Sequence, residues 1–171
     1  MEIRRVVTGH DAAAKSVVLF DGEAPNVKVR KAQGGVVSTL VWVTDEAPAN
    51  VSLKTDRAAR DIGVAPPPSG SVFRIVDFPP LSQAPPLSSE AVKKEMGLAG
   101  HASSRHPLMH RTRSVDYAIV LEGEIDMLLD DSEIHLRAGD VLVQQATNHA
   151  WINRGSRSCR MAFVLIDAKE P

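Results

Sequence analysis

The side chains best suited to chemistry lie in the C-terminal half of this 171-residue sequence. Two histidines, His110 and His149, occur there together with the carboxylate of Asp116. Histidine changes its charge near neutral pH and is the commonest metal ligand, and both residue types can act as a general acid or base. Residues separated by one position face the same side of a strand, so we expect Thr112 to share a face with His110, and Trp151 with His149.

The elements that must position these residues have the pattern of short strands. Alternating or apolar runs end at turn sequences such as Glu122-Gly123 and Ala138-Gly139-Asp140. The predicted strands are 116–121, 124–129, 133–137, 141–144, 150–153 and 160–167. Short strands with frequent turns and almost no helix are typical of an antiparallel sandwich or barrel. Within one of these strands, His135 alternates with apolar neighbours and is expected to face solvent.

The first 80 residues contain strand patterns, a polar loop and, shortly afterwards, a helix. Three apolar runs predict strands at 16–20, 36–43 and 71–78. The segment 47–68 is polar and poor in large apolar residues, which favours a long surface loop. The run 88–97 predicts a helix of about two turns, because Ser88 is a good N-cap and Gly97 is a good helix end.

Composition and charge narrow the classes of function. The formal net charge of -1 gives no electrostatic reason to expect nucleic acid or an anionic membrane as a partner. No apolar run approaches the ~20 residues needed to span a bilayer, and no apolar signal-peptide core follows the N-terminus. Cys159 is the only cysteine, so an intramolecular disulfide is impossible and a packing role is expected. We therefore expect a cytoplasmic protein.

The stretch that begins at His110 resembles the conserved barrel of the cupin superfamily. The first motif of that family is written G-x5-H-x-H-x3,4-E-x6-G. His110, Thr112, Asp116 and Gly123 fall at the positions of its first histidine, second histidine, glutamate and final glycine. Threonine thus replaces a histidine ligand, and aspartate replaces the glutamate.

The second cupin motif, G-x5-P-x-G-x2-H-x3-N, is also similar to this sequence. Gly139 opens it, and the segment 149–153 (HAWIN) closes it with the family's spacing between histidine and asparagine. The segment 144–148 (QQATN) replaces the proline–glycine turn of the family and is one residue shorter. The resemblance covers residues 110–167, about a third of the chain.

The resemblance implies a metal site as one interpretation. Metal-binding cupins bring three histidines and a glutamate together inside the barrel. The remaining ligands here would be His110, Asp116 and His149, holding one divalent transition metal such as Fe, Mn, Zn or Ni. Two imidazoles and one carboxylate resemble the facial arrangement of non-haem iron sites. His106 is either a substitute for the missing ligand or a loop histidine, and Pro107 argues against a continuous helix that would align it with the site.

Two further interpretations of the same residues stay open. Without a metal, His110, Thr112, Asp116 and His149 would form a polar cluster that hydrogen-bonds a ligand, with His149 or Asp116 as the catalytic base. Alternatively, they form a structural network. The other candidates for ligand contact are Tyr117, Gln144 and Trp151. For the two aromatic residues, core packing is the alternative.

The fold expected from these observations is all-β: a cupin-type antiparallel barrel (jelly roll) with an N-terminal strand extension and one short helix. Its parts would be a β arm at 1–80 that packs on the barrel or on a partner subunit, a linker with the helix at 81–110, and the barrel core at 110–168. Together they would form one structural domain. We also expect a homodimer, because apolar strands such as 36–43 would need a partner surface.

The expected function is binding of a polar or carboxylated small organic molecule inside the barrel. The first hypothesis is an enzyme of dioxygenase, decarboxylase, isomerase or lyase type, acting through a divalent metal or through acid–base chemistry. The second is a non-catalytic binding protein that has lost the metal site. A regulatory module is a third, but no helix-turn-helix pattern accompanies the barrel. The fold alone does not choose among these.

Overall fold

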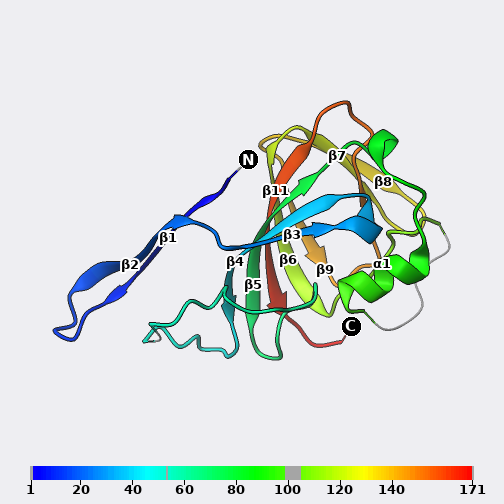
Figure 1. The fold of residues 1–171 in the computed structure, drawn as a ribbon. Coiled ribbons are helices and arrows are strands. Elements are labelled where there is room, and N and C mark those ends of the chain that lie inside the picture. Colours follow the sequence, from blue (N-terminus) through cyan, green and yellow to red (C-terminus); the bar gives the residue numbers. More distant parts are fainter. Residues whose placement is uncertain (1, 53, 99–104, 171) are drawn as a thin grey trace.

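The computed structural model, which describes residues 2–52, 54–98 and 105–170, consists mainly of antiparallel strands (Figure 1). The larger sheet has the order β3 (Asn26–Arg30), β4 (Val36–Thr44), β5 (Ser71–Phe78), β11 (Cys159–Asp167), β6 (Ser114–Glu122) and β9 (Val141–Gln145). The smaller sheet has the order β10 (Ala150–Ile152), β7 (Glu124–Leu128) and β8 (Glu133–Arg137). The remaining elements are β1 (Arg4–His10), β2 (Ser16–Glu23), the short 3-10 helices η1 (Lys31–Gln33) and η2 (Leu81–Gln83), and α1 (Ser89–Met96). The expected all-β barrel with one short helix is confirmed.

Strand β11 joins the two halves of the chain. It pairs with β5 on one side and with β6 on the other. Strands β4 and β3 extend the same sheet beyond β5. Residues 26–78 therefore contribute strands to the barrel wall, whereas the sequence suggested an arm over all of 1–80. Among the described residues, only the β1–β2 hairpin forms a separate two-stranded sheet, and it extends away from the barrel (Figure 1).

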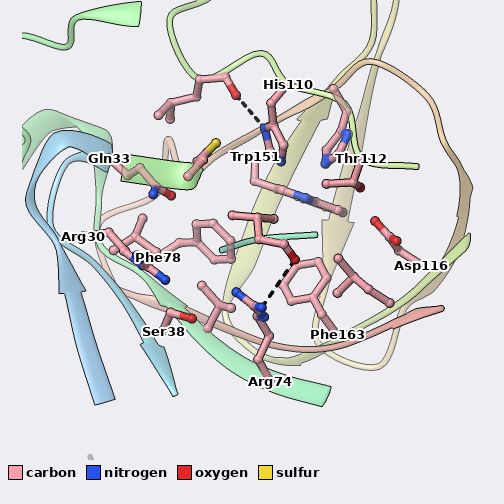
Figure 2. Close-up of a pocket in the computed structure, with 17 residues that line it drawn as sticks. Arg30, Gln33, Ser38, Arg74, Phe78, His110, Thr112, Asp116, Trp151 and Phe163 are labelled. Atoms are coloured by element: carbon pink, nitrogen blue, oxygen red, sulfur yellow. Dashed lines mark hydrogen bonds between the residues drawn. The ribbon is translucent and has the colours of Figure 1, made fainter. Parts of the chain in front are cut away.

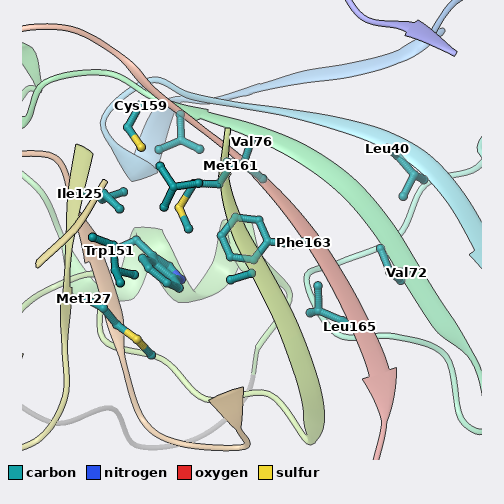
Figure 3. Close-up of a cluster of buried hydrophobic side chains, with 14 of the residues drawn as sticks. Leu40, Val72, Val76, Ile125, Met127, Trp151, Cys159, Met161, Phe163 and Leu165 are labelled. Atoms are coloured by element: carbon teal, nitrogen blue, oxygen red, sulfur yellow. The ribbon is translucent and has the colours of Figure 1, made fainter. Parts of the chain in front are cut away.

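The main hydrophobic core lies inside the barrel, between the two sheets (Figure 3). Alternation along β11 directs Met161, Phe163 and Leu165 into this core. Met127 and Trp151 of the smaller sheet pack in the same cluster. Burying side chains of this size stabilises a fold by about 1.5 to 3 kcal/mol each. The core therefore holds the two sheets face to face.

Helix α1 forms where the sequence predicted it. The side chain of Ser88 accepts a backbone N–H at the start of the helix, and Gly97 ends it in the left-handed conformation with φ 70°. Eight residues are too few for a helix to be stable alone in water. Val92 and Met96 are buried and pack in a second apolar cluster with residues of β7 and β10, which holds the helix in place.

Strand β4 corrects the argument that residues 36–43 need a partner subunit. β4 is paired with β3 on one side and with β5 on the other. Val36, Leu40 and Val43 are buried within the same chain. The sheet itself covers this strand, so any dimer must use another surface.

Cys159 has the packing role expected of it. The residue is fully buried and belongs to the main core. Burial, together with the negative charges of nearby carboxylates such as Asp77, raises the pKa of its thiol to about 12. Because the thiolate is the reactive form, this cysteine is inert near neutral pH.

Apolar side chains also lie on the surface. The exposed ones on the arm and on the two edges of the larger sheet include Val18, Val27, Val29, Val141 and Val143. His135 is exposed on β8, as predicted, and its Nδ1 lies 2.8 Å from a carboxylate oxygen of Asp126. Within the described residues, no helix has the length and apolar character needed to cross a membrane.

Candidate functional site

A cavity inside the barrel brings together residues from both halves of the chain (Figure 2). It encloses about 720 Å³ of empty space, its open mouth included. Much of its wall is apolar, and the larger contributors are Phe78, Trp151, Phe163 and Leu165. The polar lining comes from the C-terminal half at His110, Thr112, Asp116 and His149, and from the N-terminal half at Arg30, Gln33, Ser38 and Arg74.

His110 and His149 form a tightly held pair. Their backbones are joined by two reciprocal N–H···O=C hydrogen bonds of 2.9 Å. The ring centroids are 4.4 Å apart. Each Nδ1 also contacts the backbone carbonyl two residues earlier, that of Leu108 at 2.9 Å and that of Thr147 at 3.0 Å. A carbonyl only accepts hydrogen bonds, so Nδ1 carries the proton and Nε2 retains a free lone pair.

Burial keeps both imidazoles neutral. It lowers the pKa of His110, and it lowers the pKa of His149 well below the ordinary value, with the neighbouring His110 as the second cause. His149 is 2% exposed. Figure 2 shows the ring of His110 at the cavity wall, with its Nδ1 held by the backbone. The pair therefore presents two unprotonated Nε2 atoms near neutral pH.

Asp116 is the end of a buried hydrogen-bond chain. Its Oδ1 accepts from the hydroxyl of Ser114 at 2.5 Å, and its Oδ2 accepts from Nε2 of Gln144 at 2.8 Å. Ser114 has only one hydroxyl proton, so Thr112 must donate to it across their 2.8 Å contact. Burial raises the pKa of Asp116 to about 6 despite these donors and the positive charge of Arg74. Asp116 can therefore exchange a proton close to neutral pH.

The structure does not assemble the metal site that the sequence suggested. Within residues 2–52, 54–98 and 105–170, no group of three or more histidine, cysteine, aspartate or glutamate side chains could hold a metal ion. Asp116 belongs to a hydrogen-bond chain with Ser114 and Gln144 and is not in one group with the two imidazoles. The set His110, Asp116 and His149 therefore does not form a three-ligand site here.

The other candidates divide into residues inside and outside the cavity. Trp151 lines it, with its ring centroid 6.0 Å from that of His149. Gln144 is buried behind Asp116 and is not part of the lining. Tyr117 corrects a prediction: its side chain is 46% exposed, because it alternates with the inward-facing Asp116 along β6. His106 also lies outside the lining, and its Nδ1 accepts the backbone N–H of Leu108.

Four polar residues of the cavity were missed by the sequence analysis. Arg30, Gln33, Ser38 and Arg74 belong to the strands and turn of the N-terminal half, where no motif was recognised. One signal was available. Arg74 shares the inward face of β5 with the buried Val72 and Val76, and a charged side chain on such a face indicates a functional or structural role.

Comparisons with known proteins identify cupin-domain relatives of this chain. A family model described as the cupin domain matches residues 95–166. A phomopsin biosynthesis cluster protein of Diaporthe leptostromiformis is 35% identical, over 96% of this chain and 78% of that protein. A cupin-domain-containing oxidoreductase of Neurospora crassa is 30% identical, over 99% of this chain and 77% of that protein. A solved cupin 2 conserved barrel domain protein of Salinispora arenicola is 12% identical, with a TM-score of 0.44 over 84% of this chain and 82% of that one.

Proposed function

Because this chain belongs to the cupin superfamily, we propose that its cavity binds a mostly apolar small organic molecule and catalyses a proton transfer on it. The observation that carries the proposal is the buried pair of neutral imidazoles in the cavity wall. The printed names of the relatives, which include a biosynthesis cluster protein and a cupin-domain-containing oxidoreductase, support a role in small-molecule chemistry.

His149 is the proposed base. Its Nε2 lone pair accepts a proton from the bound molecule, and the bond from Nδ1–H to the carbonyl of Thr147 stabilises the imidazolium that results. Since burial lowers the pKa of His149 well below its ordinary value, the imidazolium returns its proton readily. His110 lies beside it and keeps its own Nε2 unprotonated.

Asp116 is the proposed acid. Its pKa of about 6 leaves part of the carboxyl population protonated near neutral pH. Burial lowers the pKa of His149 and raises that of Asp116, so near neutral pH the imidazole is free to accept a proton while part of the carboxyl population can donate one. One proton leaves the substrate to His149 and another arrives from Asp116 at a second atom, so the reaction is an isomerisation or an elimination of water.

A metal has no assigned step in this proposal. The residues that the structure brings together offer two imidazole nitrogens, and a catalytic zinc or iron site uses at least three protein ligands. We therefore expect less than one equivalent of Fe, Mn, Zn or Ni per chain after dialysis. Elemental analysis measures this directly.

The test is hydrogen–deuterium exchange at carbon. The unlabelled probe is benzylacetone, an aryl ketone with exchangeable hydrogens next to its carbonyl, incubated in D2O and followed by NMR. We expect the wild-type protein to accelerate exchange and His149→Ala to lose at least about 100-fold of that rate, the usual range for a general base. The control is His135→Ala, whose imidazole is exposed on β8.

Three outcomes would contradict this proposal. Equal exchange rates for wild type and His149→Ala would show that His149 is not the base. Tight binding of aryl ketones with no exchange at stoichiometric protein would support the non-catalytic binding protein. A stoichiometric metal that is lost in both His110→Ala and His149→Ala would support a metal-dependent enzyme.

A further inference from the structure

The N-terminal strands place two guanidinium groups against the cavity. Arg74 of β5 is 6% exposed, and Arg30 stands at the end of β3. Figure 2 shows Ser38 and Arg74 toward the bottom of the view and Arg30 at the left, away from His110 at the top. The site therefore has a cationic side and an imidazole side.

No carboxylate among the described residues forms an ion pair with Arg74. Its Nη2 donates to the backbone carbonyls of Gly63 at 3.0 Å and Val64 at 3.4 Å. Its Nε is buried and donates to no described residue. The Nε2 of Gln33 is likewise buried and donates to no described residue. Unpartnered buried donors are rare in native proteins, because a buried donor without an acceptor loses the hydrogen bond that it would make with water. Two of them beside one cavity indicate a ligand that supplies acceptor oxygens.

The charges of the lining point to an anion. Arg30 and Arg74 carry two positive charges, while ionised Asp116 carries one negative charge and the two histidines are neutral. Burial lowers the pKa of Arg74 to about 10, which still leaves it charged near neutral pH. The lining thus keeps one uncompensated positive charge. A buried charge without a partner is unfavourable, so a monoanion is the complementary ligand.

We propose that Arg74 and Gln33 bind the carboxylate of an aryl or alkyl carboxylic acid, and that this contact sets which molecules the cavity accepts. A carboxylate supplies an acceptor oxygen for the unpartnered Nε–H of Arg74 and one negative charge that complements its guanidinium. Phe78, Trp151 and Phe163 line the cavity and contact the apolar part of the molecule. The inference rests on the proposed function, because it names the substrate class of the same cavity.

The test compares two molecules that differ only in the anionic group. Benzylpyruvate carries a carboxylate where benzylacetone carries a methyl group. By titration calorimetry, we expect wild-type protein to bind benzylpyruvate about 10- to 100-fold more tightly, the range for hydrogen bonds to a charged group. Arg74→Met should bind both equally, and Arg74→Lys should retain part of the preference. Arg113→Met, which removes an exposed guanidinium paired with Asp167, is the control.

A second variant guards against loss of folding in Arg74→Met. Gln33→Leu removes a donor without a described partner, so it should fold normally and reduce the ratio of benzylpyruvate affinity to benzylacetone affinity severalfold. Any of three results would overturn the inference. They are equal affinity of wild type for the two molecules, an unchanged preference in Arg74→Met or Gln33→Leu, and tighter binding of inorganic phosphate than of benzylpyruvate. Benzylpyruvate bound through Arg74 without carbon exchange would refute the proposed function alone. Exchange that needs His149 without any carboxylate preference would refute the carboxylate site alone.

Discussion

At the scale of single residues, burial tunes the cavity in two directions at once. Removing water disfavours whichever form is charged, so it lowers the pKa of His149 and raises that of Asp116. Gln144 adds a detail that fits a protonated partner. Its Oε1 is buried with no hydrogen bond from the described residues, and it lies on the amide that donates to Asp116. After rotation of the amide, this oxygen can accept a hydrogen bond from the hydroxyl of neutral Asp116.

Asp116 makes a pH-dependent contribution to stability that a substitution can isolate. Its folded pKa of about 6 exceeds the ordinary 3.8, so the folded protein holds an extra proton between these values. The contribution is fully present below pH 3.8 and is lost as the pH rises through about 6. Asp116→Asn stays neutral. Its free energy of unfolding relative to wild type should therefore increase by up to about 3 kcal/mol between pH 4 and pH 7.5.

Urea unfolding at several pH values measures this difference. Asp167→Asn is the control with the opposite sign, because the backbone N–H of Ser69 and the charge of Arg113 lower the pKa of Asp167. The stability of that variant relative to wild type should fall as the pH rises. A pH-independent difference for Asp116→Asn would mean that its carboxyl is not buried as the structure has it.

At the scale of elements, the turn between β6 and β7 connects the two sheets and has little room. Gly123 occupies it with φ 78°. A Cβ at Gly123 would lie 2.8 Å from the carbonyl oxygen of Ser158 and 3.1 Å from the Cα of Cys159. The glycine is needed both for its backbone conformation and for this close approach of the start of β11.

Gly139→Ala provides a matched comparison for this turn. Gly139 also has a positive φ, 95°, but a Cβ there would meet nothing within 4 Å. Gly139→Ala should therefore cost about 1 to 2 kcal/mol from backbone strain alone. Gly123→Ala should cost clearly more, because backbone atoms of β11 must also move. Denaturant unfolding of both variants checks this, and equal losses would show that the contact at Gly123 is readily relieved.

At the scale of the whole molecule, homodimer formation stays a prediction, now with a different surface. The β1–β2 arm projects from the barrel, and a two-stranded hairpin is marginal by itself in water. Its base is held by Arg5, which is 7% exposed and pairs with Asp56 at 2.6 Å. Strand β9 forms one edge of the larger sheet, and its residues Val141 and Val143 are 72% and 61% exposed. An uncovered apolar edge strand favours association.

We expect sedimentation to give a mass of about twice 18.5 kDa at micromolar concentration. Val143→Asp should shift the mass toward the monomer, because it places a charge on the proposed contact. Val51→Asp is the control, since Val51 is 75% exposed in the loop between β4 and β5. A monomer at these concentrations, or a dimer unaffected by Val143→Asp, would contradict the proposed interface.

The sequence by itself determined the local features of this protein. Alternation predicted 133–137 as a strand, and the N-cap and terminal glycine predicted the helix that begins at Ser89, because period and capping depend on neighbouring residues. The rule that residues two apart on a strand share a face placed Trp151 beside His149. Applied to Tyr117, which follows Asp116 directly, the same rule would have placed its side chain on the outer face of β6. Spacing along the chain therefore decides which way a side chain points.

Only the tertiary structure decided which side chains meet. Arg74 of β5 and Asp116 of β6 are far apart in sequence and reach one cavity because β11 pairs with both strands. Asp116 was expected to complete a metal site, but the structure places it in a hydrogen-bond chain with Ser114 and Gln144, and its contact with Gln144 depends on the pairing of β6 with β9. The pKa values follow from the same packing, since burial is a property of the assembled barrel and not of the sequence pattern.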